Sequence, residues 1–322
     1  MHDCQYTFDP NLLWFKFKNM IKKFIAWLLP YMPKKLVWIF SRRYIAGEKI
    51  EDAIKVAKEL NNNGIKVTID LLGEYITRLE EAEENRKAYI DIIERITAEG
   101  IDGNFSVKPS MFGLLLDKEV CYQNLRDVVK KAAEKNNFVR IDMEDSSCVD
   151  REFELFRKLK AEFPGHVGIV VQAYLRRTLD DLNNLLDLHN EQYPLNYRLC
   201  KGIYVEPASI AFKGYQEVRD HFVEDLDFML KNGIYAGIAT HDKYLVQKAF
   251  ELIEKYNVPR NRYEFQMLYG VTPELRNSIV KEGHTMRVYV PFGKHWFGYS
   301  TRRLKENPNM VWHIIKALFY RG

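Results

Sequence analysis

Residues 138–174 read FVRIDMEDSSCVDREFELFRKLKAEFPGHVGIVVQAY, a helix-like segment enclosed by two short apolar runs. The two runs, FVRIDME (138–144) and VGIVVQAY (167–174), have the length and the β-branched content of buried strands. A strand, a helix and a second strand in this order form a right-handed unit with parallel strands. This stretch therefore predicts a layered α/β fold.

The same unit recurs along the chain at a spacing of about 30 residues. Segments with the 3.6-residue period of helices lie between the strands, and glycines mark several of their ends: Gly64, Gly100, Gly233 and Gly283. Thr272 and Pro273 are typical of a helix start. Six further runs bring the predicted strands to eight: VTIDLL (67–72), GNFSVKPS (103–110), NYRLCKGIY (196–204), YAGIATH (235–241), YEFQML (263–268) and MRVYV (286–290).

Eight units favour a closed barrel over an open, doubly wound sheet. The open sheet of a nucleotide-binding protein normally has a glycine-rich turn after its first strand, but Gly-Glu-Tyr-Ile-Thr follows VTIDLL here. We therefore predict a (β/α)8 TIM-type barrel at residues 49–322, preceded by an N-terminal helical arm at residues 1–48. The open sheet is the alternative.

Composition excludes several classes of protein. The 322 residues are 47% hydrophobic and 29% charged, which is typical of a folded globular chain, and a net charge of +4 is too small for a nucleic-acid-binding surface. The four cysteines include no C-x-x-C pair, so neither a disulfide framework nor a metal site is predicted. The apolar run 24–32 is too short to span a membrane. These features predict a cytoplasmic protein.

The N-terminal stretch is locally basic and aromatic. Eight lysines and arginines and no acidic residue lie between Lys16 and Arg43, interleaved with large apolar side chains. Such a helix can lie on an anionic membrane surface, which would give peripheral contact with the inner membrane face. It can equally pack on the barrel as an accessory arm with solvated lysines, and the sequence leaves both interpretations open.

In a barrel of this kind the active site lies at the carboxyl ends of the strands. Burying many charges there is costly unless they pair with one another or meet a charged ligand. The alternative is that some of them form an interior polar layer. The polar residues predicted at these ends are Lys108, Asp142, Glu144, Gln172, Arg198, Lys201, Thr240, His241, Glu264, Gln266 and Tyr289.

A second motif, YSTRRLKEN (299–307), follows the last strand. Adjacent arginines at the start of a helix can bind one carboxylate, because guanidinium is planar, permanently charged and capable of bidentate hydrogen bonding. A solvated helix face is the competing interpretation of Arg302 and Arg303.

From about residue 64 to 307 the chain resembles the proline dehydrogenase family and the matching domain of the bifunctional proline utilisation A proteins. In combination and in order, the shared motifs are highly specific. They are SVKPS (106–110), RIDMED (140–145), VVQAYLRRT (170–178), RLCKGIYVEP (198–207), ATHD (239–242), EFQMLYG (264–270), RVYVPFG (287–293) and YSTRRLKEN (299–307).

The resemblance implies FAD-dependent oxidation of L-proline to 1-pyrroline-5-carboxylate, the first step of proline catabolism, with electrons passed to a quinone. FAD would lie non-covalently across the strand ends, with Arg198 near flavin N5 and with Thr240 and His241 at the phosphate or adenosine part. The full cofactor-binding set implied is Met143, Gln172, Arg198, Lys201, Gly202, Ile203, Thr240, His241 and Glu306, the last also bracing the arginine pair.

For the substrate, the resemblance implies binding by Lys108, Tyr289, Tyr299, Arg302 and Arg303. Asp142 and Arg198 are the predicted catalytic residues. Asp142 is the candidate proton acceptor, since Lys108 would serve only with a depressed pKa. Tyr289 fills the space that a ring hydroxyl would need, which favours unmodified proline over hydroxyproline.

The chain departs from the family's usual pattern at two positions, where Cys200 and Ile203 replace Val and Ala. A bulkier side chain at Ile203 is expected to crowd the flavin edge or to shift the range of substrates. No aldehyde dehydrogenase domain is visible, so a separate pyrroline-5-carboxylate dehydrogenase is expected downstream.

Two other functions are compatible with the residues alone. Lys108 and Lys201 at strand ends would suit a Schiff-base aldolase or decarboxylase, although this leaves Arg302 and Arg303 unexplained. A membrane-surface binding protein without catalysis would use the N-terminal arm, but the full set of charges at the strand ends argues against a barrel that has lost its chemistry.

Overall fold

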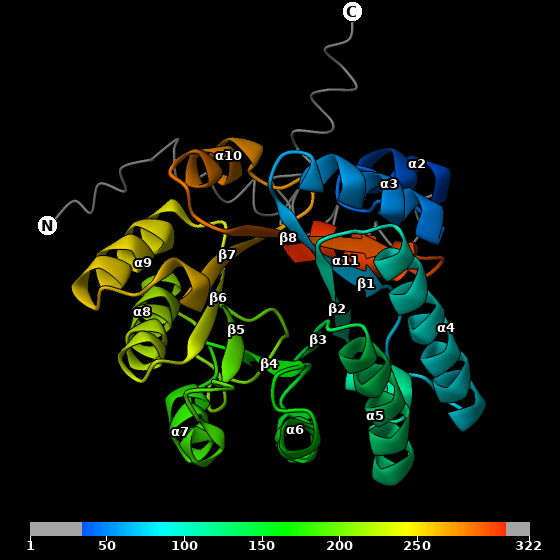
Figure 1. Ribbon diagram of the computed structural model, residues 1–322, viewed down its shortest axis with the longest axis horizontal. Helices are drawn as coiled ribbons and strands as arrows, with labels where there is room; N and C mark the ends of the chain where they lie inside the picture. The colour runs from blue at the N-terminus through cyan, green and yellow to red at the C-terminus, as the bar shows by residue number, and fades with distance from the viewer. Residues whose placement is uncertain (1–33, 307–322) are drawn as a thin grey trace, which may run out of the picture. The chain divides into compact units, whose positions relative to one another are not determined.

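The computed structural model describes residues 34–306, whose strands form one closed parallel barrel (Figure 1). Each strand pairs with the next along the chain, and β8 pairs with β1 to close the ring. The predicted eight-stranded barrel is therefore confirmed, and the open sheet is excluded. The strands are β1 (Lys66–Leu71), β2 (Gly103–Val107), β3 (Val139–Ile141), β4 (Val167–Gln172), β5 (Asn196–Cys200), β6 (Tyr235–Ala239), β7 (Tyr263–Leu268) and β8 (Met286–Phe292).

A helix precedes or follows each strand and covers the outside of the ring (Figure 1). Gly64, Gly100, Gly233 and Gly283 all have positive φ, as expected of glycines that end helices. The helices are α3 (Ile50–Asn61), α4 (Leu79–Ala98), α5 (Lys118–Glu134), α6 (Val149–Glu162), α7 (Thr178–Asn184), α8 (Tyr215–Lys231), α9 (Lys243–Lys255) and α10 (Pro273–Lys281), with single turns η2 (Pro109–Phe112), η3 (Leu186–Leu188) and η4 (Arg260–Arg262).

The apolar core lies between the strands and the helices, because alternate residues of each strand point outward. On β1, for example, Val67 and Ile69 are fully buried in this layer. The alternate positions point into the ring, where polar side chains contact one another across strands, as Thr68 does with Asn104. The interior of the ring is therefore polar. The buried polar residues on the strands are Thr68, Asp70, Asn104, Ser106, Arg140, Gln172, Arg198, Glu264 and Gln266.

Several strands end earlier than the sequence predicts. The predicted strands at 103–110, 138–144 and 196–204 end at Val107, Ile141 and Cys200. The chain turns at these points, since Pro109 begins a one-turn helix and Gly202 has a φ of 105°. Lys108, Asp142 and Lys201 consequently lie just beyond the strands, at the barrel mouth formed by their carboxyl ends.

The described residues divide into two units, the barrel at Tyr44–Lys294 and a smaller unit. The smaller unit contains α2 (Lys34–Ser41) and α11 (Trp296–Glu306), which pack together with the rings of Trp38 and Trp296 4.8 Å apart. The basic and aromatic stretch up to residue 33 lies outside the described residues, so the predicted arm and its boundary at residue 48 stay predictions. No helix within residues 34–306 is long and apolar enough to cross a bilayer.

Candidate active site

A buried ion pair between Asp142 and Arg198 forms the centre of the barrel mouth. The Oδ1 atom of Asp142 accepts hydrogen bonds from Arg198 Nη1 at 2.9 Å and from Ser106 Oγ at 2.5 Å. Its Oδ2 atom accepts a hydrogen bond from the Tyr289 hydroxyl at 2.8 Å. Side chains from β2, β5 and β8 thus converge on the carboxylate that follows β3.

Lys108 joins a second carboxylate to this centre. Its Nζ atom lies 2.8 Å from Asp70 Oδ1, 3.6 Å from Asp142 Oδ2 and 3.3 Å from the Tyr289 hydroxyl. Asp70 is fully buried, so a cation beside it is needed to offset the cost of removing its charge from water. Two cations therefore alternate with two acidic side chains across the mouth. Burial raises the pKa of Asp70 and the Asp142 charge adds to this, while Lys108 opposes the rise.

The surroundings of these groups set their protonation states. Burial alone would raise the pKa of Asp142, but Lys108 and Arg198 outweigh it and the pKa lies below its usual range. Burial alone would lower the pKa of Lys108, but the negative charge of Asp70 and its neighbours raises it well above the ordinary value. Asp142 is therefore a carboxylate and Lys108 an ammonium at neutral pH, so the depressed pKa that Lys108 needs for a role as base is not found.

Arg198 is held from two sides and retains one unused donor. Its Nε atom donates to Gln266 Oε1 at 2.5 Å, and its guanidinium carbon lies 5.2 Å from the centre of the Tyr289 ring. Gly237 makes room for Gln266, because a Cβ atom there would lie 2.6 Å from its Nε2 atom. The Arg198 Nη2 atom is buried without a hydrogen-bond partner in the described structure. A buried donor of this kind is costly and points to a ligand.

A second cluster lies beyond the ends of β5 and β6. Asp242 accepts from Lys201 Nζ at 2.5 Å and from Arg219 at 2.7 Å and 2.8 Å, and its backbone N–H donates to Thr240 Oγ1. Burial alone would raise the pKa of Asp242, but the hydrogen bonds from Arg219 and Lys201 hold it well below its usual range. The structure therefore brings Lys201 and Thr240 together around an acidic partner.

His241 is fixed beside this cluster by β7 and α10. Its Nδ1 atom lies 3.1 Å from Thr272 Oγ1, and its Nε2 atom accepts from the backbone N–H of Leu268 at 3.2 Å. Pro273 begins α10 as predicted, but Thr272 has a φ of 43° and its hydroxyl contacts His241 rather than capping the helix. The hydroxyl of this helix start thus helps to position a residue of the predicted cofactor site.

Gly202 is required by its conformation and by its neighbour. Its φ of 105° disfavours any other residue, and a Cβ atom would lie 2.1 Å from Cδ1 of the Tyr174 ring. Gly202→Ala is expected to lower the free energy of unfolding by roughly 3 kcal/mol, because backbone strain and a ring clash add. Urea unfolding measures it.

The matched control for this prediction is Gly283→Ala, since Gly283 has a φ of 77° with nothing within 4 Å of the added Cβ atom. It should show the backbone strain alone, about 1–2 kcal/mol. Equal losses in the two variants would show that the contact with Tyr174 has no role.

The other predicted cofactor residues lie on neighbouring segments. Gln172 is buried at the end of β4 and donates to the backbone carbonyl of Glu144 at 2.8 Å, beside the buried Met143. Ile203 is 40% exposed, and the expected crowding of the flavin edge by its side chain stays a prediction.

The predicted substrate residues on α11 belong to the smaller unit. Tyr299 is half-buried there. The prediction that Arg302 and Arg303 start this helix is wrong, because α11 begins at Trp296 and places both arginines in its second half, beyond the free N–H groups of the first turn. The side chains of residues 302–306, including Glu306, fall outside the part of the structure that is described. Their approach to Lys108 and Tyr289 stays a prediction.

Four residues of the two clusters were not singled out from the sequence: Asp70, Ser106, Arg219 and Asp242. Asp70 breaks the apolar run VTIDLL, and a carboxylate inside a buried strand is a usable signal for a polar interior. Ser106 and Asp242 lie within the motifs SVKPS and ATHD. Their partners depend on the pairing of strands far apart in sequence, which no local pattern gives.

Comparison with known proteins gives one consistent result. The sequence model of the proline dehydrogenase family matches residues 53–312. Proline dehydrogenase 1 of Bacillus subtilis subsp. natto is 37% identical over 278 residues, covering 86% of this chain and 90% of that protein. The proline dehydrogenase of Deinococcus radiodurans is 34% identical, covering 89% and 92%.

Among solved structures, proline utilization A from Bdellovibrio bacteriovorus inactivated by N-propargylglycine superposes with a TM-score of 0.77 at 26% identity. The match covers 83% of this chain but 33% of that longer protein. The match to the family's sequence model and the similarity to its single-function members extend over most of the chain. The chain therefore belongs to the proline dehydrogenase family.

Proposed function

We propose that the protein oxidises L-proline to 1-pyrroline-5-carboxylate with FAD as its cofactor. The observation that carries this proposal is the balanced network of Lys108, Asp70, Asp142, Arg198 and Tyr289 at the barrel mouth, with one buried arginine donor left unused. Such a network holds charged groups at fixed positions without a net charge of its own. The reaction is indicated by the proline dehydrogenase family, to which the chain belongs.

The residues present fit a flavin. The unused Nη2 donor of Arg198 suits an electron-rich ring, and the cation of Lys201 suits phosphate. FAD would supply the hydride acceptor. We assign its binding to Met143, Gln172, Arg198, Lys201, Gly202, Ile203, Thr240, His241 and Glu306.

Proline would bind as a zwitterion through Lys108 and Tyr289 of the first cluster and through residues of α11. Arg302 and Arg303 would bind its carboxylate, with Tyr299 and Tyr289 against the ring. The Tyr289 hydroxyl is tied to Asp142 at 2.8 Å, so the phenol is fixed in place. A fixed phenol would leave no room for a ring hydroxyl, which supports unmodified proline as the substrate.

Asp142 is the proposed acceptor of the substrate's proton. Its lowered pKa makes it a weak base, while the raised pKa of Lys108 removes that residue from the role. We therefore assign Asp142 a second task, which is to hold Arg198 and Tyr289 in position as a carboxylate.

The aldolase alternative is disfavoured by the same geometry. Imine formation needs a neutral lysine. Lys108 has a raised pKa, and Lys201 forms an ion pair with Asp242 at 2.5 Å. A barrel that only binds membranes would gain nothing from a buried, balanced network of this kind.

Product analysis tests the proposed reaction directly. Purified protein is incubated with L-proline and an artificial electron acceptor, and the products are identified by mass spectrometry. We expect 1-pyrroline-5-carboxylate to form only when the acceptor is present. Borohydride trapping of a keto substrate on Lys108 or Lys201 would instead support the aldolase, and it is the result that contradicts this proposal.

We further infer a quinone as the physiological acceptor, a separate pyrroline-5-carboxylate dehydrogenase downstream, and peripheral contact with the inner face of the membrane through the N-terminal stretch. Removal of residues 1–33, which keeps α2 and its packing on α11, separates these roles. Turnover with the artificial acceptor should persist, while turnover with quinone in anionic vesicles should fall.

A further inference from the structure

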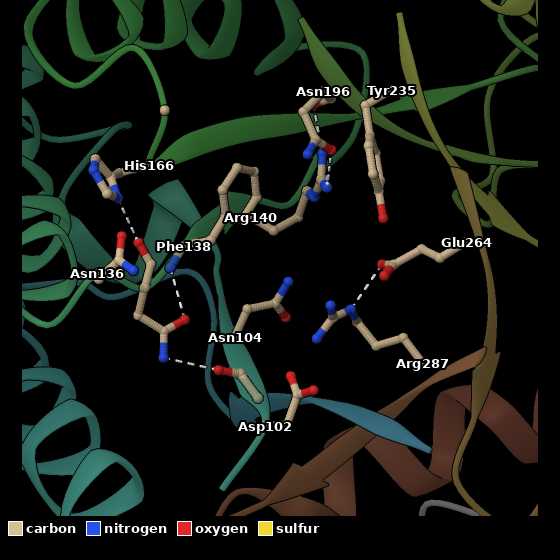
Figure 2. A pocket seen from close by; sticks show the side chains of 13 residues that line it. Asp102, Asn104, Asn136, Phe138, Arg140, His166, Asn196, Tyr235, Glu264 and Arg287 are labelled. Carbon is tan, nitrogen blue, oxygen red and sulfur yellow. Dashed lines mark hydrogen bonds and ion pairs between the residues drawn. The ribbon is translucent and has the colours of Figure 1, made fainter. Parts of the chain in front are cut away.

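A cavity of about 280 Å³ opens at the amino-terminal ends of the strands, the end opposite the candidate active site (Figure 2). Its wall is made by residues from β2, β3, β5, β6, β7 and β8 and the loops that precede β2 to β4. The volume would hold about nine waters, which is enough for a small ion. The side chains that matter here are Asn104, Arg140, Glu264 and Arg287, with Asp102 at the rim.

Arg140 is 1% exposed and incompletely bonded. Its Nη1 atom donates to the carbonyl oxygens of Asn196 at 2.6 Å and Ile169 at 3.2 Å, whereas its Nε atom is buried without a partner in the described structure. Gly168 on the neighbouring strand makes room for it, because a Cβ atom there would lie 2.5 Å from Nη1. Burial and the charge of Arg198 lower the pKa of Arg140 to about 9. Arg140 therefore stays protonated at neutral pH, although both its burial and Arg198 disfavour its charge.

Arg287 adds a second cation, and the Glu264 carboxylate interacts with both arginines. Its Nε atom donates to Glu264 Oε1 at 2.7 Å and its Nη1 atom to the carbonyl of Val67 at 2.8 Å. Burial alone would lower the pKa of Arg287, but Glu264 and, to a smaller extent, Asp102 raise it. Asp102 is exposed and also forms an ion pair with Lys66 at 2.9 Å, so it does not belong to the buried wall. The buried wall therefore carries one uncompensated positive charge, which favours an anion.

The unused atoms narrow the chemistry of that anion. Within the described residues, Glu264 Oε2 is buried without a partner at hydrogen-bond geometry, although the Tyr235 hydroxyl interacts with the Glu264 carboxylate. This wall therefore offers an acceptor as well as the unused Arg140 Nε donor. A simple carboxylate or chloride satisfies only the arginine. Hydrogen phosphate has oxygens for guanidinium and a hydroxyl for Glu264, and guanidinium binds it well.

We propose that this cavity binds a phosphate group, as inorganic phosphate or a small phosphate ester, between Arg140 and Arg287. Glu264 also accepts from Gln266 Nε2 at 2.6 Å, and Gln266 holds Arg198, so hydrogen bonds connect the cavity to the opposite mouth. The bound anion would thus act on the position of Arg198 without touching the substrate.

Two single substitutions of opposite sign test the site. Asn104→Asp adds a negative charge in the wall with almost no change in volume, and the aspartate can keep the hydrogen bond from Thr68 Oγ1, which is 2.6 Å long. Asp102→Asn removes a negative charge from the rim. Lys118→Met is the control, because it removes an exposed cation at the start of α5 that does not line the cavity.

The experiment is calorimetric titration of the cofactor-bound protein with inorganic phosphate at constant ionic strength. We expect saturable binding by the wild type, at least about 10-fold weaker binding by Asn104→Asp, about 2-fold tighter binding by Asp102→Asn and unchanged binding by Lys118→Met. Thermal unfolding confirms that each variant is folded. If Asn104→Asp does not fold, Asp102→Asn and Lys118→Met still decide the question.

A parallel titration with glycerol 3-phosphate distinguishes a phosphate ester from inorganic phosphate as the ligand. The compound that binds more tightly shows which of the two the cavity accepts. The proposal is overturned if the wild type binds neither compound, if Asp102→Asn weakens binding, or if Lys118→Met weakens binding as much as Asn104→Asp does, which would indicate a general effect of charge. None of these outcomes depends on proline turnover.

Discussion

Arg198→Met is expected to lower kcat/KM for L-proline by about 100- to 1,000-fold, an increase of roughly 3–4 kcal/mol in the activation free energy. Arg198 is the donor that joins Asp142, Ser106 and Gln266, and its remaining Nη2 donor is the one we assign to the flavin. Methionine keeps much of the side-chain volume but removes the charge and every donor. Steady-state kinetics with an artificial acceptor, together with anaerobic stopped-flow reduction by proline, measures the loss.

One further variant separates the charge of Arg198 from its planar shape, and a second variant is a surface control. Arg198→Lys keeps the charge without the planar fork and should recover part of the activity. Arg157→Met removes an arginine from the surface of α6, where it pairs with Asp187 at 2.7 Å, and should leave kinetics unchanged. A folded Arg198→Met enzyme with near wild-type kinetics would show that Arg198 is not part of the catalytic site.

Asp142→Asn should destabilise the protein by about 3–5 kcal/mol and lower the activity as well, because it leaves two buried cations with one carboxylate fewer. The pKa of Asp142 is lowered by Lys108 and Arg198, so its stabilising effect is present above the unfolded-state pKa of about 3.9 and is lost as pH falls further. The difference in the free energy of unfolding between the wild type and the variant should therefore be constant near neutral pH and become smaller below about pH 4. Urea unfolding at a series of pH values measures it.

Asp187→Asn is the matched control, since Asp187 forms an exposed ion pair with Arg157 and its side chain is 61% exposed. Its loss should cost less than about 1 kcal/mol. If Asp142→Asn lowered the free energy of unfolding by a similarly small amount, the charge network at the mouth would not stabilise the fold.

The barrel was predictable because its strands are short, apolar and evenly spaced. The ends of the strands were not, since FVRIDME and NYRLCKGIY continue with residues that suit a strand but turn into loops after Ile141 and Cys200. What ends these strands is the set of side-chain contacts at the mouth, and those contacts join segments far apart in sequence.

The same reason explains which site residues were found. Lys108, Asp142, Arg198 and Tyr289 were predicted from motifs and strand ends, and the structure brings them together. Asp70 was missed because its role follows from the pairing of β1 with β2 and β8, which places it beside Lys108.

The cavity at the opposite end was also hidden in the sequence. Arg140 and Arg287 stand in RIDMED and RVYVPFG, where they look like the first residues of strands that lead toward the active site. Their burial follows from the polar interior of the ring and from the space that Gly168 leaves.

The most direct test of the central claim is the visible absorption spectrum of the purified protein before and after L-proline is added without oxygen. Without oxygen or another electron acceptor, a flavin that accepts a hydride from proline stays reduced and loses its visible absorption band. We predict a yellow protein that proline bleaches. A colourless protein, or a yellow one that proline does not bleach, would contradict the proposed function.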